Sequence, residues 1–434
     1  MRRWSFMKKL RKSMHKAALA ATLCAALISG TTSIAPATPA YAWDTASAIG
    51  ALISVGAQYA YAEKQLSYLN GDGRFQYMNQ VKQQVGVDQA PEANAMLRDV
   101  MTRLSASIAQ TDPSIKQKPY NYFVNKQKSF NAFCTLGHNL SVNIGLFEDL
   151  NYNEDEIAFV VAHELGHGEK NHPAAGVRKA LPLELLSALY ASQNPNTASI
   201  LGATVASRIG TAKMVTKPME SEADKLAFGY AVGAGYNPGA GAAVWQRVIE
   251  KVNPNGGKSS FISDLFNDHP GNIARRDKYN DTMYEFSNKK VHVDPDTGMI
   301  LIKGKNFYTP KAADGMTAKE RSYLIAGNLS AVFHNRMSER NVWTDGNNIL
   351  MVGPQPIMAM ASVAEPAAVQ DNLQRLVTTT GGELKAAHKE ELAAAKTTVS
   401  GKKVTTVDDE ARKRAALQKR LDKIAAQEPA ATGK

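Results

Sequence analysis

The pattern of apolar and polar positions changes its period at Asn153. Residues 121–150, NYFVNKQKSFNAFCTLGHNLSVNIGLFEDL, alternate and are rich in Phe, Val, Ile and Tyr, which predicts two or three short strands. From Asn153 the apolar residues recur at helical spacing, and the acidic run at 154–156 suits the first turn of a helix. We therefore expect a helix from Asn153 to about Asn171, ended by Pro173.

Further elements are predicted on both sides of this region. The apolar stretch at 44–63 indicates a packed amphipathic helix rather than a membrane segment, because Gly, Ser, Gln and Tyr interrupt it. We find no convincing internal repeat. After residue 288 we expect a hairpin at 289–304, an amphipathic helix at 316–335, a strand at 347–356 and Ala-rich charged helices beyond Pro366. The other expected helices cover residues 74–85, 91–109, 217–235, 238–252 and 269–286.

The N-terminus has the features of an export signal. MRRWSFMKKLRKSMHK carries seven basic residues and no acidic one, and an apolar run too short to span a bilayer follows. Ala40-Tyr41-Ala42 supplies a cleavage site before Trp43, with Ala37 as a second candidate. We therefore expect residues 1–42 to be a signal peptide and the protein to be exported to the periplasm or cell envelope.

The charge of the chain argues against a nucleic-acid partner. The full sequence of 434 residues has a formal net charge of +11. Residues 1–42 contain seven of its 51 basic residues and none of its 40 acidic ones, so the remainder carries +4. Most of the basicity thus belongs to the predicted signal, and we expect no nucleic-acid binding. Cys134 alone remains after cleavage, so no intramolecular disulfide is expected, and no Cys/His signature surrounds it.

The segment FVVAHELGHGEKNHP contains a candidate metal site. His163 and His167 are four residues apart, so on a helix both imidazoles point to one side, as a tetrahedral zinc site needs from its first two ligands. Glu164 is rotated by about 100° from His163. Its carboxylate therefore lies beside the metal, where it can act as general base on a water that zinc has acidified.

A third ligand must come from another segment. Glu184 lies in an apolar stretch where an exposed glutamate is the simpler interpretation. In ESEAD, Glu220 and Asp224 share one helix face, so one can bind the metal while the other supports a ligand histidine, and Glu222 points away from both. We take Glu220 as the third zinc ligand and Asp224 as the supporting residue.

His172 does not complete a metzincin motif. That motif, H-E-x-x-H-x-x-G-x-x-H, requires Gly and His where this chain has Lys170 and Pro173. We therefore interpret His172 as a histidine at the end of the helix, outside the site.

Four segments together resemble a known peptidase family. NAFCTLGHNLSVNIGLFEDL, DEIAFVVAHELGHGEKNH, ESEADKLAFGYAVGAGYNP and DHPGNIARRDKY, in this order, are similar to gluzincin zinc metallopeptidases of the HtpX and CAAX prenyl protease superfamily. The soluble exported bacterial branch, BepA/LoiP-like, is the most similar. The resemblance covers roughly residues 70–285. It implies an α+β fold, a mainly helical zincin domain with a small β-sheet edge.

The resemblance also implies roles for individual residues. One Zn²⁺ per chain would be bound by His163, His167 and Glu220, with Glu164 as base and Asp224 supporting. His269 and Arg275 match the H-P-x-x-x-x-R element, which implies that His269 contacts zinc or a transition-state oxygen and that Arg275 binds a carboxylate near the cleft. His269, next to Pro270, could equally be a plain loop histidine. The strand with Asn131 and Ala132 would pair with an extended substrate.

The expected domains are a signal peptide (1–42), a zinc metallopeptidase domain (43–288), a small α+β module (289–360) and an Ala-rich helical tail (361–434). The leading hypothesis is an exported zinc endopeptidase that cleaves extended or misfolded envelope proteins. An envelope chaperone or assembly factor with a closed zinc site is the alternative, and an amidase acting on cell-wall peptides is a third hypothesis. The sequence also permits peripheral association of the protein with the cell envelope.

Overall fold

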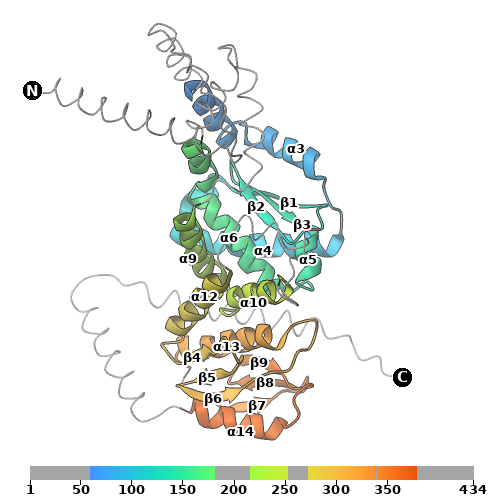
Figure 1. The fold of residues 1–434 in the computed structure, drawn as a ribbon, viewed down its shortest axis with the longest axis vertical. Helices are drawn as coiled ribbons and strands as arrows, with labels where there is room; N and C mark the ends of the chain where they lie inside the picture. Colours follow the sequence, from blue (N-terminus) through green and yellow to red (C-terminus); the bar gives the residue numbers. More distant parts are fainter. Residues whose placement is uncertain (1–58, 181–215, 253–271, 338–339, 379–434) are drawn as a thin grey trace, which may run out of the picture. The chain divides into compact units, whose positions relative to one another are not determined.

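The computed structural model describes residues 59–180, 216–252, 272–337 and 340–378 (Figure 1). Its helices accompany three small three-stranded sheets, so the prediction of a mainly helical α+β fold is confirmed. In these residues no helix has both the length and the apolar character needed to cross a membrane. The predicted signal peptide and most of the predicted 44–63 helix lie outside the described residues.

The first helices agree with the expected ranges. Helix α3 spans Arg74–Val85 and α4 spans Pro91–Thr111. The apolar positions of α4, from Ala93 to Ile108, are buried and join the main core. Pro91 begins α4, at a position where the missing N–H of proline costs no hydrogen bond.

The first sheet has three strands, in the order β1-β3-β2. Strands β1 (Asn121–Asn125) and β3 (Asn139–Asn143) are parallel, and β2 (Ala132–Thr135) runs antiparallel to β3. Short helices flank the sheet at Pro113–Lys116 (η1) and Ile144–Asp149 (α5). β2 therefore forms an edge of the sheet, as predicted for the strand at Ala132.

Helix α6 (Glu154–Glu169) passes through the core and carries the candidate metal site (Figure 1). The Asn153 side chain caps it by accepting a hydrogen bond from the N–H of Glu156. The helix ends two residues earlier than predicted. Asn171 has a positive φ of 52°, and a new helical run at 172–180 follows, with Pro173 in its first turn. Pro173 thus begins a helix instead of only ending one.

Three further helices surround α6. These are α9 (Lys217–Gly233), α10 (Ala240–Val252) and α12 (Asn272–Phe286), and α9 packs most extensively against α6. Gly166 allows this approach, because a Cβ at this position would lie 3.1 Å from the carbonyl oxygen of Ala223 in α9. The small residue therefore brings the two helices that carry the predicted ligands together.

The C-terminal region contains the same structural unit twice, three antiparallel strands followed by a helix. The first unit comprises β4 (Val291–Val293), β5 (Ile300–Ile302), β6 (Lys305–Tyr308) and α13 (Ala318–His334). The second comprises β7 (Val342–Thr344), β8 (Ile349–Val352), β9 (Gln355–Ala359) and α14 (Pro366–Val377).

Details of the two units agree. Asp294 and Asp345 each accept two backbone N–H hydrogen bonds in the first turn of their unit. Both units have a register shift in the second strand pair, and a glycine with positive φ, Gly304 or Gly353, follows the second strand. The expectation that the chain has no internal repeat is therefore wrong, because the repeat is one of topology and turn geometry.

Candidate metal centre

Two histidines of α6 point to one place, as their spacing predicted. Nε2 of His163 lies 3.0 Å from Nε2 of His167, and both side chains are buried. Apolar residues at positions 157–162 and Leu165 pack the rest of this helix into the core. Burial of the helix leaves the two imidazoles little freedom to turn away.

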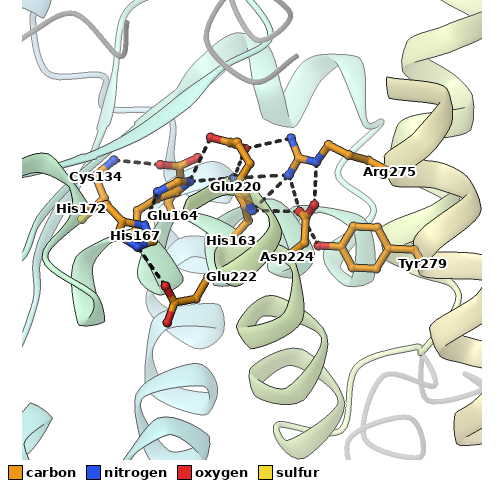
Figure 2. A network of polar contacts seen from close by, with 10 residues as sticks. All are labelled: Cys134, His163, Glu164, His167, His172, Glu220, Glu222, Asp224, Arg275 and Tyr279. Atoms are coloured by element: carbon orange, nitrogen blue, oxygen red, sulfur yellow. Dashed lines mark hydrogen bonds and ion pairs between the residues drawn. The ribbon is translucent and has the colours of Figure 1, made fainter. Parts of the chain in front are cut away.

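Glu220 approaches both histidines from helix α9. Its Oε2 lies 3.4 Å from Nε2 of His163 and its Oε1 lies 3.4 Å from Nε2 of His167. Figure 2 shows the three side chains converging from the two helices. Within the described parts of the chain, His163, His167 and Glu220 form the one buried group whose donor atoms lie close enough to hold a metal ion.

The donor set and the local charge fit a divalent cation. Two imidazole nitrogens and one carboxylate oxygen are the ligand types of a catalytic zinc site. The buried carboxylates of Glu220 and Asp224 both contact one guanidinium, that of Arg275, and the carboxylate of Glu164 is buried nearby. Acidic groups therefore outnumber the guanidinium at this site, which favours the binding of a cation.

The pKa values of His163 and His167 are shifted in opposite directions. Burial and the charge of Arg275 lower the pKa of His163, but the acceptors Asp224 and Glu220 outweigh them and raise it to about 9. Burial lowers the pKa of His167 to about 4, although Glu220 opposes this. The proton that His163 retains competes with a metal ion for the same nitrogen lone pair.

Asp224 supports His163 from one turn further along α9. Its Oδ1 lies 3.1 Å from Nδ1 of His163 and accepts a hydrogen bond from the hydroxyl of Tyr279 at 3.0 Å. Both ring nitrogens of His163 therefore have a carboxylate oxygen nearby, and Nη2 of Arg275 also lies 3.1 Å from Nδ1. A hydrogen on Nδ1 donated to Asp224 would leave the Nε2 lone pair for a metal ion. Burial raises the pKa of Asp224, but Arg275 and His163 outweigh it and hold this pKa below its usual range.

Arg275 of α12 connects the two carboxylates of α9. Its Nε donates to Oδ2 of Asp224 at 2.8 Å, and its Nη2 donates to Oδ1 of the same residue. Nη1 lies 3.3 Å from Oε2 of Glu220, and the guanidinium stacks 4.0 Å from the ring centre of Trp245. The residue predicted to bind a carboxylate near the cleft therefore contacts the protein's own carboxylates.

Glu164 faces strand β2 rather than the histidines. Its Oε2 accepts a hydrogen bond from the backbone N–H of Cys134 at 3.0 Å (Figure 2). Desolvation and the charge of Glu164 raise the pKa of the Cys134 thiol well above its usual range, which favours an unreactive thiol. Gly168 keeps this region compact, because a Cβ there would lie 2.9 Å from Sγ of Cys134.

The main chain of β2 alternates between β3 and the open edge. The N–H of Asn143 donates to the carbonyl of Asn131, so Asn131 directs its carbonyl towards β3. The backbone groups of Ala132 and Cys134 consequently point the other way. The N–H of Ala132 donates to the side-chain Oδ1 of Asn131 at 3.0 Å.

The prediction that His172 lies outside the site is wrong, because its side chain contacts His167. His172 is buried, and its Nδ1 lies 2.9 Å from Nδ1 of His167. The sequence signal that could have located it is the turn before Pro173, which restarts the helix and reverses the direction of the side chain. His269 and Glu184 lie outside the described residues.

Comparison with known proteins agrees with this geometry. Residues 91–281 match the profile of Peptidase family M48, a stretch that contains β2, α6, α9 and the first part of α12. The chain is 24% identical over 320 residues to the beta-barrel assembly-enhancing protease of Escherichia coli (strain K12), a match covering 71% of this chain and 59% of that protein.

Shorter matches involve two other peptidases. Metalloprotease LoiP of Escherichia coli (strain K12) is 30% identical over 176 residues, which are 39% of this chain and 65% of LoiP. The mitochondrial metalloendopeptidase OMA1 of Arabidopsis thaliana is 30% identical over 146 residues, 33% of this chain and 28% of OMA1. This chain therefore matches less than two thirds of the length of each of these relatives.

Proposed function

Residues 91–281 match the profile of Peptidase family M48, and on this premise we propose that the chain is an exported zinc-dependent endopeptidase that hydrolyses extended or misfolded envelope proteins. The observation that carries the proposal is the buried convergence of His163, His167 and Glu220 beside Glu164. We assign one Zn²⁺ to the first three residues. A zinc ion bound there supplies Lewis acidity, which polarises a substrate carbonyl and acidifies water.

Glu164 is the proton-transfer group in this proposal. It follows His163 directly in the helix, so its carboxylate lies beside the ligands and borders strand β2. In the reaction Glu164 takes the proton of the attacking water and passes it to the leaving amide nitrogen. Its contact with the Cys134 N–H fixes the carboxylate between the histidines and the substrate edge.

The edge of β2 supports an extended substrate. The backbone groups of Ala132 and the carbonyl of Cys134 point away from β3, and a peptide strand would pair with them, while the Cys134 N–H stays bonded to Glu164. The Asn131 side chain already satisfies the N–H of Ala132, so it must yield to the substrate carbonyl. Backbone pairing demands an extended chain more than a particular sequence, which suits unfolded substrates.

The other predicted residues receive supporting roles. Arg275 holds Glu220 and Asp224 in place through its contacts with both carboxylates. The proposal keeps His269 as a candidate for steadying the oxyanion. Exported location rests on the N-terminal sequence pattern. Action on envelope proteins rests on the expected export and on the similarity to the beta-barrel assembly-enhancing protease.

Cleavage of an unfolded protein by purified enzyme tests the proposal. We expect Glu164→Gln to retain bound zinc but to cleave about 10²- to 10⁴-fold more slowly, because the proton acceptor is lost. Glu156→Gln is the matched control, since it changes another buried glutamate of α6 far along the helix, and it should cleave normally. Chelation should abolish cleavage, and zinc should restore it.

Two results would overturn the proposal. Equal cleavage by the natural protein and by Glu164→Gln would show that Glu164 is not the general base. Tight binding of the unfolded protein without cleavage by either would favour the chaperone alternative.

A further inference from the structure

The turn after α6 brings a buried histidine against one of the assigned ligands. Asn171 adopts a positive φ, and the helical run that follows places His172 beside His167. Their Nδ1 atoms are 2.9 Å apart, and His172 is 4% exposed. This contact lies on the side of the His167 ring opposite to Nε2, the atom that faces Glu220.

A carboxylate contacts the other side of the His172 ring. Nε2 of His172 lies 3.4 Å from Oε2 of Glu222, which comes from α9 two residues after Glu220. Lys170 contacts the same carboxylate, with its Nζ 3.4 Å from Oε1 of Glu222. Figure 2 shows Glu222, His172 and His167 in line.

The direction of the hydrogen bonds between these three side chains follows from the carboxylate of Glu222. Glu222 only accepts, so Nε2 of His172 carries the hydrogen and, in the neutral ring, Nδ1 is an acceptor. His167 must then donate from its own Nδ1, which leaves the lone pair on its Nε2 facing Glu220.

We propose that His172, oriented by Glu222, is the positioning residue that fixes the tautomer and ring direction of the zinc ligand His167. The inference rests on the proposed zinc site. Asp224 performs the same task for His163, so each histidine ligand has its own acceptor behind it. Such acceptors raise the basicity of a ligand and restrict its rotation, which strengthens metal binding.

Zinc affinity of full-length variants, measured by competition with a chromophoric chelator, tests this role. Asn and Leu have nearly the same shape, but only Asn keeps an oxygen close to the position of Nδ1. We expect His172→Leu to bind zinc about 10- to 100-fold more weakly. His172→Asn should stay within about threefold of the natural protein, because it still accepts the hydrogen bond.

A control separates this effect from local loss of packing. Tyr120→Phe removes a buried hydrogen bond to the carbonyl of Leu165 on the same helix and touches no assigned ligand, so its zinc affinity should not change. If His172→Leu does not fold, His172→Gln replaces it, because its acceptor sits one bond further out and should not rescue binding. Visible absorption of the Co²⁺-substituted proteins should shift with Leu or Gln and not with Asn.

The outcomes distinguish this inference from the proposed function. If the natural protein binds no zinc in a one-to-one ratio, the zinc site itself is overturned. If it binds zinc and His172→Leu binds as tightly, or Asn and Leu weaken binding equally, the positioning role is overturned.

Discussion

Helix α6 carries two clusters of buried charge, one in its first turn and one in its second half. In the first, Glu156 and Glu320 both contact Arg247, whose Nη2 lies 3.4 Å from Oε2 of Glu156. In the second, Arg275 contacts Asp224 and Glu220 in a similar way. Each cluster thus joins helices by placing one guanidinium between two carboxylates.

The two clusters differ in how the remaining negative charge is balanced. Burial and the charge of Glu320 raise the pKa of Glu156 well above its usual range, which favours a protonated carboxyl in the first cluster. The second adds two imidazoles whose nitrogen atoms lie close to each other and to Glu220, which suits a cation. Histidine geometry, rather than buried charge itself, therefore distinguishes the candidate metal site from a structural ion cluster.

Removing the guanidinium of the first cluster should have the largest effect on stability. Arg247→Met leaves two buried carboxylates without a cation and should lower the free energy of unfolding by about 3–5 kcal/mol. Urea denaturation measures this loss, with and without zinc. The loss should be the same in both, since the cluster has no metal role; a loss that zinc repairs would contradict the distinction.

Weakening the support of His163 should affect mainly metal binding. Asp224→Asn removes a negative charge and the carboxylate acceptor of Nδ1, so zinc affinity should fall about 10- to 100-fold. Competition titration gives the affinity. Glu320→Gln is the matched control, because it neutralises a carboxylate of the first cluster and keeps the residue type suited to its capping box. Equal zinc affinity of Asp224→Asn and Glu320→Gln would contradict the view that Asp224 supports metal binding and Glu320 does not.

The smallest expected effect concerns pH. Because the pKa of Glu156 is raised in the folded protein, its stabilising contribution is complete below about pH 4.5 and is lost as pH rises through the folded pKa. Glu156→Gln imitates the protonated side chain and should remove this decline. At pH 8 the variant should be more stable by about 1 kcal/mol, the scale of one buried hydrogen bond. Urea denaturation at several pH values measures this difference. If the stability of the natural protein and of Glu156→Gln changes with pH in the same way, Glu156 does not carry the proton.

Local spacing was sufficient to predict the elements that carry the chemistry. The ranges of α3 and α4 and the start of α6 follow the predicted periodicity closely. The i, i+4 spacing of His163 and His167 predicted their convergence, because a helix brings such residues to one face whatever surrounds it. Glu220 was also predicted, since the four-residue spacing to Asp224 suggested paired roles.

Contacts between distant segments could not be predicted in the same way. The repeated C-terminal unit was missed, because its two copies share turns and strand registers more than residues. The partners of Arg275 depend on how α12 packs beside α9, which residue order alone does not determine.

Periodicity within one helix was enough to predict the convergence of His163 and His167, the place of Glu164 beside them and the amphipathic helices. The groups that contact these histidines from behind depend instead on packing between helices. Packing of α9 and α12 against α6 pairs Asp224 with Arg275, and the turn at Asn171 carries His172 back to His167. Such contacts arise from helix packing and one backbone turn, whose directions are set by the whole core.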